Sequence, residues 1–91
     1  MLNNARKLFT YELTNGTFTI GSTDGFSRFS IYNATSTAGS YTGSQTANGI
    51  DSGAVSVAQN ETAVVDVGNA YVIDYLLITA PAGCTLKLMG S

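Results

Sequence analysis

The chain has 91 residues, of which 44% are hydrophobic and 11% charged, and its formal net charge is −2. This length suffices for one domain with a thin core, and we expect a single domain over residues 1–91. Histidine and tryptophan are absent and there is one cysteine, which excludes an intrachain disulfide framework, a Cys/His zinc site and imidazole catalysis. Four basic residues in an acidic chain argue against a nucleic-acid-binding surface.

Residues 1–7 are predicted to form a short N-terminal arm ahead of the first strand. Polar residues interrupt this arm, so it lacks the apolar run of about 7–15 residues that a secretory signal needs. No stretch of the chain reaches the roughly 20 apolar residues of a membrane-spanning helix. We therefore expect a protein that is made in the cytoplasm and contacts no membrane.

The clearest local pattern surrounds the Asn15-Gly16 pair. Apolar and polar residues alternate on both sides of it, and Asn-Gly is the preferred sequence of a two-residue type I′ turn because both residues accept positive φ. A hairpin is therefore predicted over residues 9–20, with Leu13 opposite Phe18. Its apolar face would carry Phe9, Tyr11, Leu13, Phe18 and Ile20, and its polar face Thr10, Glu12, Thr14, Thr17 and Thr19.

Weaker patterns follow in the middle of the chain. Residues 22–25 predict a turn, and residues 26–32 predict a strand with Phe29 and Ile31 on one face. Residues 33–52 are rich in Ser, Thr, Asn and Gly. They predict a long loop or one poorly packed edge strand.

Strand patterns return in the last part of the chain. Residues 54–58 and 62–67 predict two strands joined by a tight turn at residues 59–61. Residues 71–89 predict a last hairpin, with Pro81 in its loop, where the missing N–H of proline does no harm. The core-facing residues of that hairpin would be Leu76, Ile78, Ala80, Leu86 and Leu88.

These segments together predict about seven or eight short strands separated by frequent turns. The chain leaves no room for the helices of parallel βαβ units. We therefore expect an all-β fold, namely a single antiparallel β-sandwich or a small jelly roll.

No motif in the sequence predicts catalysis or a cofactor. The serines lack a neighbouring base, since there is no histidine and no Ser-x-x-Lys. The carboxylates are assigned to turns and solvent-facing strand positions, except that Asp74 interrupts an apolar run and is predicted to be a buried structural carboxylate. Cys84 is predicted to be a small buried hydrophobe. We expect no enzyme activity, no cofactor and no metal site.

The C-terminal half reads AVSVAQNETAVVDVGNAYVIDYLLITAPAGCTLKLMG: a strand, a polar turn, a second strand and an apolar final hairpin. With the Ser/Thr/Asn/Gly-rich composition, it resembles the small all-β virion structural proteins of tailed bacteriophages, in particular capsid decoration (cement) proteins and the bases of head fibres. The resemblance implies a non-enzymatic virion protein, made in the host cytoplasm. It also implies a homo-oligomer, often a trimer, that binds the major capsid protein or other virion proteins outside the shell.

Four residues are candidates for contact with such partners. Arg6 and Lys7 form a basic pair suited to an acidic neighbouring protein. Tyr41 and Ile50 are the large apolar residues of the polar middle segment, and a neighbouring subunit would cover them.

Two alternatives stay open: a receptor- or carbohydrate-binding module of a fibre or adhesin, and a connector or tail component of the virion. A carbohydrate platform would use exposed aromatic rings. The candidates for it are Phe26, Tyr32, Tyr41, Tyr71 and Tyr75.

Overall fold

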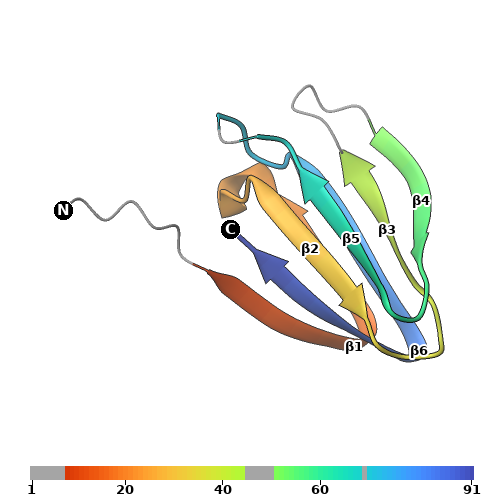
Figure 1. The fold of residues 1–91 in the computed structure, drawn as a ribbon. Coiled ribbons are helices and arrows are strands. Elements are labelled where there is room, and N and C mark those ends of the chain that lie inside the picture. The colour runs from red at the N-terminus through yellow and green to blue at the C-terminus, as the bar shows by residue number, and fades with distance from the viewer. Residues whose placement is uncertain (1–7, 45–50, 69) are drawn as a thin grey trace.

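The structure, a computed structural model, describes residues 8–44, 51–68 and 70–91, and this part of the chain is nearly all β (Figure 1). Its strands are β1 (Phe9–Gly21), β2 (Arg28–Asn33), β3 (Gly39–Ser44), β4 (Asp51–Val57), β5 (Glu61–Asp66) and β6 (Tyr75–Gly90). They form one curled antiparallel sheet in the order β4-β3-β6-β2-β5, and β1 pairs with β6 alongside. The all-β fold class predicted from the sequence is confirmed.

The strands β1 and β6 are long, and each pairs in two halves. Residues 9–14 of β1 pair with residues 85–90 of β6, whereas residues 16–21 pair with residues 75–80. The C-terminal half of β6 continues the sheet to β2 and β5, and the N-terminal half continues it to β3 and β4. The sheet therefore has two parts, the β2–β5 part and the β3–β4 part, which share β1 and β6.

The hairpin predicted at Asn15-Gly16 is wrong. Asn15 does adopt a positive φ of 49°, but Gly16 does not have a positive φ, and a type I′ turn needs one at both central residues. The chain bends at this point and continues as one strand, and both halves pair with β6 rather than with each other.

The final hairpin predicted around Pro81 is wrong for the same reason. Residues 81–84 lie outside the β1–β6 register, opposite the bend at Asn15, and β6 runs through them as one strand. Two predicted hairpins are thus two bent strands. The described residues contain six strands rather than the seven or eight expected.

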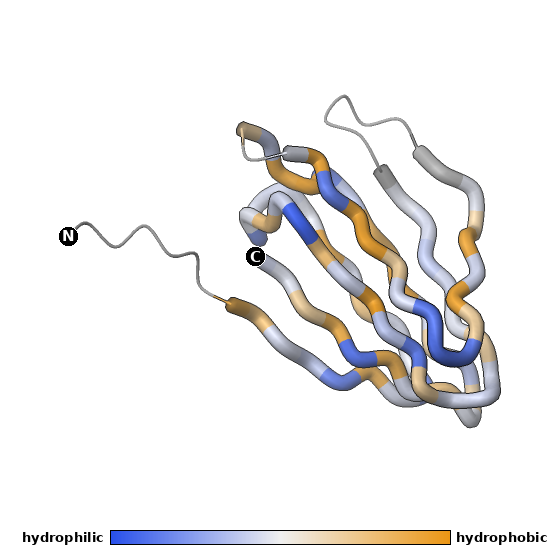
Figure 2. The backbone as a smooth tube through the Cα atoms, viewed as in Figure 1, coloured by the Kyte–Doolittle hydropathy of each residue, from blue (hydrophilic) through white to orange (hydrophobic). Residues whose placement is uncertain are grey.

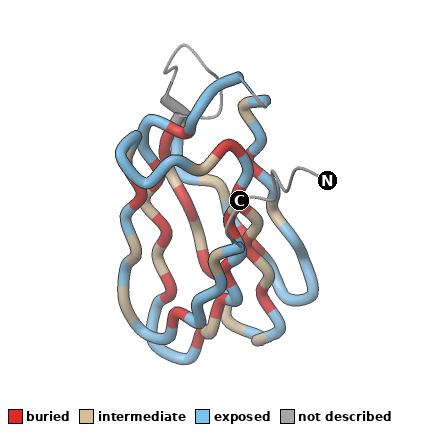
Figure 3. The backbone as a smooth tube through the Cα atoms, turned by 90° about the vertical axis from the view of Figure 1, so that its left-hand side faces the viewer, coloured by how far each residue is buried: buried red, intermediate tan, exposed pale blue. Residues whose placement is uncertain are grey.

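The predicted division of side chains between core and solvent nevertheless holds for β6, and it holds for β1 except at Tyr11, a residue of the predicted apolar face that is 49% exposed. The β1 threonines and Glu12 are exposed, while Leu13 and Ile20 are buried. The apolar residues predicted to face the core in β6 are all buried. Buried and exposed residues alternate along the strands in Figure 3, and hydropathy alternates with them in Figure 2. The core comprises Leu13, Ile20, Phe29, Ile31, Tyr41, Val57, Val65, Ile73, Leu76, Ile78, Ala80, Cys84, Leu86 and Leu88.

The middle and late segments match the predictions in part. A 3-10 turn (η1, Ser22–Asp24) ends at Gly25, whose φ is 75°, so the turn predicted there is confirmed. The polar segment 33–52 contains β3, which lies inside the sheet between β6 and β4. The strands predicted at residues 54–58 and 62–67 are β4 and β5, joined by a turn in which Glu61 N donates to Ala58 O at 3.1 Å.

Asp74 is exposed, so its prediction as a buried carboxylate is wrong.

Asn33 is a fully buried polar residue that forms hydrogen bonds to several segments at the end of the sheet near the bends. The Asn33 Nδ2 group donates to Thr37 O and to Val57 O, both at 2.9 Å. Its Oδ1 atom accepts hydrogen bonds from the backbone N–H of Thr35 at 2.9 Å and from the Thr35 hydroxyl. Cys84 Sγ lies 3.9 Å from the same oxygen. Asn33 thus connects the end of β2, the following loop, the end of β4 and residue 84 of β6.

Candidate functional site

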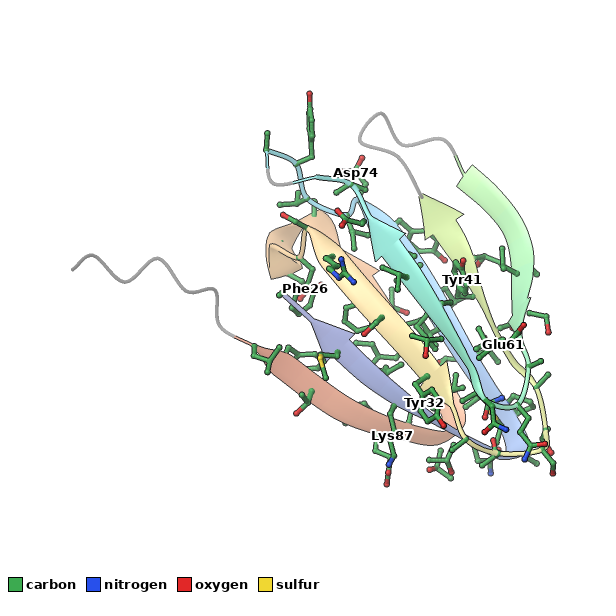
Figure 4. The ribbon with its side chains drawn as sticks, viewed as in Figure 1. Phe26, Tyr32, Tyr41, Glu61, Asp74 and Lys87 are labelled. Carbon is green, nitrogen blue, oxygen red and sulfur yellow. The ribbon has the colours of Figure 1, made fainter. Side chains whose placement is uncertain are left out.

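The structure describes one of the four predicted partner contacts, Tyr41. Arg6, Lys7 and Ile50 lie outside the described residues. Tyr41, a residue of β3 (Figure 4), is 6% exposed and belongs to the core. Because the ring is packed in the core, a partner would reach it only by displacing the side chains around it.

Five aromatic rings form a column beside β1, consisting of Phe9, Tyr11, Phe18, Phe26 and Phe29 and named here the aromatic column. Ring centroids are 5.1 Å apart for Tyr11 and Phe18, 5.7 Å for Phe9 and Phe18, and 5.4 Å for Phe9 and Phe26. In a straight strand, positions 9 and 18 would be about 30 Å apart. The contact therefore shows how strongly β1 bends, and it brings the two halves of the strand face to face.

The aromatic column runs from the core to the surface. Phe29 at its inner end is fully buried, while Tyr11 at its outer end is 49% exposed and Leu8, just before β1, is 60% exposed. Among the described strands, β1 pairs with β6 alone, so its other edge presents unpaired backbone groups next to these rings. The only charged residue in β1 is Glu12, and the strand contains no proline. Apart from Glu12 and the irregular register between Thr14 and Gly16, β1 thus carries few of the features by which natural edge strands avoid further pairing.

A second feature lies on the solvent-facing side of the β2–β5 part. A hollow of about 640 Å³ opens there over β1, β6 and β2. Its outward-pointing side chains, named here the outer groove, are Thr10, Glu12, Ser30, Tyr32, Lys87 and Met89. Lys87 pairs with Glu12 on one side and Tyr32 on the other, and Met89 pairs with Thr10 and Ser30 in the next row. Figure 4 shows Tyr32 and Lys87 on neighbouring strands.

This face carries one ion pair, and it also carries two opposite charges that are not paired with each other. Arg28 Nη1 and Asp66 Oδ2 are 3.4 Å apart, and both side chains are about half exposed, so the bridge contributes little to stability. It is the only ion pair within residues 8–44, 51–68 and 70–91. Lys87 and Glu12 are opposite each other in the register but form no ion pair, which leaves both head groups available to a ligand.

Sequence reasoning placed part of the outer groove correctly and missed the rest. It assigned Glu12 and Thr10 to a solvent-facing surface and named Tyr32 as an aromatic candidate, but it gave no sign that Lys87 lies between Glu12 and Tyr32. That neighbourhood depends on pairing between strands distant in the sequence. Of the other aromatic candidates, Tyr71 and Tyr75 are exposed, whereas Phe26 belongs to the aromatic column.

Two absences concern residues 8–44, 51–68 and 70–91. These residues contain no group of three or more Cys, Asp or Glu side chains arranged to hold a metal ion. They also contain no helix with the length and hydropathy to cross a bilayer.

Comparisons with models of protein families, with curated proteins and with solved structures find no match to this chain.

Proposed function

We propose that the chain is a non-enzymatic structural protein of a bacteriophage virion, of the capsid decoration or head-fibre base type, which assembles as a homo-oligomer through the exposed edge of β1. The observation that carries this proposal is the aromatic column, which emerges from the core at an edge strand with almost no charge. A second copy that covered this edge would bury the rings of Tyr11 and Phe18 and pair the backbone groups of β1.

The proposal includes a finer assignment of the fold, a small jelly-roll sandwich. The pairing supports it, because the two parts of the sheet each contain four segments and β1 and β6 pass from one part to the other. The contact between Phe9 and Phe18 supports it as well, since those rings come from different halves of β1. Jelly rolls of eight strands are a common architecture of viral capsid domains. Together with the resemblance of the C-terminal half, this favours a place in a virion, with the major capsid protein as partner.

The first test replaces Tyr11 by glutamate. In a monomer the cost is small, because the Tyr11 ring is half exposed and its stacking on Phe18 is worth about 0.5–1.5 kcal/mol. In an oligomer built on this edge, the new carboxylate would lose its water without gaining a partner, which costs several kcal/mol. Sedimentation velocity should show an oligomer, a trimer by the resemblance, for the unaltered chain and a monomer for Tyr11→Glu.

The matched control is Tyr71→Glu, which places the same charge on an equally exposed ring outside the β1 edge. It should leave the oligomer intact. A monomeric unaltered chain at all concentrations, or equal dissociation of both variants, would contradict assembly through β1.

The place in the virion needs a separate measurement. Purified particles of the phage that encodes the chain should contain it in an amount comparable with the major capsid protein, and antibodies against it should label intact heads. A chain that is present in the lysate but absent from purified heads would contradict the proposed role.

A further inference from the structure

The outer groove brings together three kinds of chemical group in one hollow. Its first row, Glu12–Lys87–Tyr32, provides an anion, a cation and an aromatic ring side by side on three strands. Its second row, Thr10–Met89–Ser30, provides two hydroxyl groups and a half-exposed thioether. Residues of both rows line the hollow.

We propose that the outer groove binds a short uncharged oligosaccharide. A sugar ring has C–H groups on its faces and hydroxyl groups around its rim. The C–H groups carry partial positive charge and pack on the negative face of an aromatic ring such as Tyr32. The hydroxyl groups can donate to the Glu12 carboxylate and accept from the Lys87 ammonium, and hydrogen bonds to charged groups are the stronger kind.

The charge balance of the groove decides between uncharged and charged ligands. Lys87 and Glu12 sum to zero, and neither forms an ion pair with a residue of the described chain. Arg28, the other described cation on this face, is already engaged by Asp66. An acidic sugar would therefore meet Glu12, and a basic one would meet Lys87, whereas an uncharged sugar uses both groups.

The size and shape of the hollow fit the same class of ligand. Its volume of about 640 Å³ lies within the range of about 300–1,000 Å³ that is typical of small-molecule sites. The hollow is open to solvent and extends over three strands, which suits a chain of two or three sugar rings lying across the sheet. An open site buries less of its ligand than a closed one, so we expect weak binding, with Kd near 1 mM.

The test is a nuclear magnetic resonance titration of the ¹⁵N-labelled chain with maltotriose, cellotriose and triacetylchitotriose in turn. At least one of these should shift the amide signals of residues 10–12, 30–32 and 87–89 in a saturable way. Tyr32→Ala should weaken that binding about tenfold. Thr10→Phe should abolish it, since the new ring fills the hollow at an exposed strand position where aromatic residues are well tolerated.

Tyr71→Ala is the matched control, because it removes an exposed tyrosine outside the groove. It should leave the titration unchanged. The proposal is overturned if none of the three sugars shifts the groove signals, if the shifts lie around Tyr71 and Tyr75 instead, or if Thr10→Phe binds as well as the unaltered chain. Dispersed amide spectra establish that each variant is folded. The groove signals report sugar binding and sedimentation velocity reports assembly through β1, so failure of one proposal is distinguishable from failure of the other.

Discussion

Replacing Asn33 by aspartate should destabilise the fold by about 3–5 kcal/mol at neutral pH, which is close to the whole stability of many small domains. The asparagine is fully buried, and its Nδ2 group donates to the carbonyl oxygens of Thr37 and Val57, both at 2.9 Å. An ionised aspartate has no donor and would place an oxygen of its carboxylate against these two acceptors. Chemical denaturation followed by circular dichroism measures the loss.

The loss should depend on pH in a defined direction. Burial and the two facing carbonyl oxygens would raise the pKa of the new carboxyl in the folded state above its ordinary value of about 3.9. Below that value the carboxyl is protonated in both states and can donate to one carbonyl. The destabilisation should therefore be smallest in acid and grow as the pH rises from about 3.9 to the folded-state pKa.

Two variants separate charge from lost hydrogen bonds. Asn33→Ala leaves the carbonyls of Thr37 and Val57 without their donor but adds no charge, so its destabilisation should not share this pH dependence. Asn15→Asp makes the same chemical change at an exposed residue and should alter stability by less than about 0.5 kcal/mol. A stability difference between Asn33→Asp and Asn33→Ala that is the same at pH 3 and pH 7 would contradict the described network.

Local alternation made the faces of β1 and β6 predictable. Successive side chains of a strand point to opposite faces, so the face of a residue follows from its immediate neighbours. This alternation holds on each side of the bend. The buried positions of Phe29 and Ile31 follow from the same rule and are confirmed. The turn at residues 22–25 was predictable too, because Asp-Gly accepts the positive φ that Gly25 adopts.

Pairing partners were not predictable, because they depend on residues far apart in the chain. Asn15-Gly16 has the residue types of a hairpin turn. In the structure, however, both halves of β1 pair with β6, so the chain does not reverse direction at this point. The burial of Asn33 depends on Thr37, Val57 and Cys84 in the same way. In a segment rich in Ser, Thr and Asn, nothing distinguishes this asparagine from its exposed neighbours.

The polar composition of residues 33–52 did not indicate that this segment contains an internal strand of the sheet. Small residues there look like a linker, yet β3 lies between β6 and β4. The alternation in Gly39-x-Tyr41-x-Gly43 was the available signal, because it places one large ring between two glycines on the same side of a strand. Glycine in a strand often marks a close approach of two backbones, and the structure bears this out at Gly43.

Gly43→Ala should destabilise the fold by about 3–5 kcal/mol, the sum of backbone strain and a clash that side-chain movement cannot relieve. Gly43 has a φ of 151°, which residues with a Cβ rarely adopt. A Cβ built there would lie 2.3 Å from Tyr75 O and 2.9 Å from Leu76 Cα, and both atoms belong to the backbone of β6. Relief therefore requires β3 and β6 to separate where they pair. For a domain of this size, the melting temperature should fall by roughly 4–8 °C per kcal/mol.

Gly53→Ala is the matched control for this prediction, since it makes the same change in the adjacent strand β4. A Cβ at Gly53 meets no atom within 4 Å and its φ is not in the positive range. This variant should be neutral or slightly stabilising, because alanine has less freedom to lose on folding than glycine. Melting curves by circular dichroism compare the two. Equal melting temperatures for Gly43→Ala and Gly53→Ala would mean that β3 does not lie against Tyr75 and Leu76. The placement of the polar middle segment inside the sheet would then be wrong.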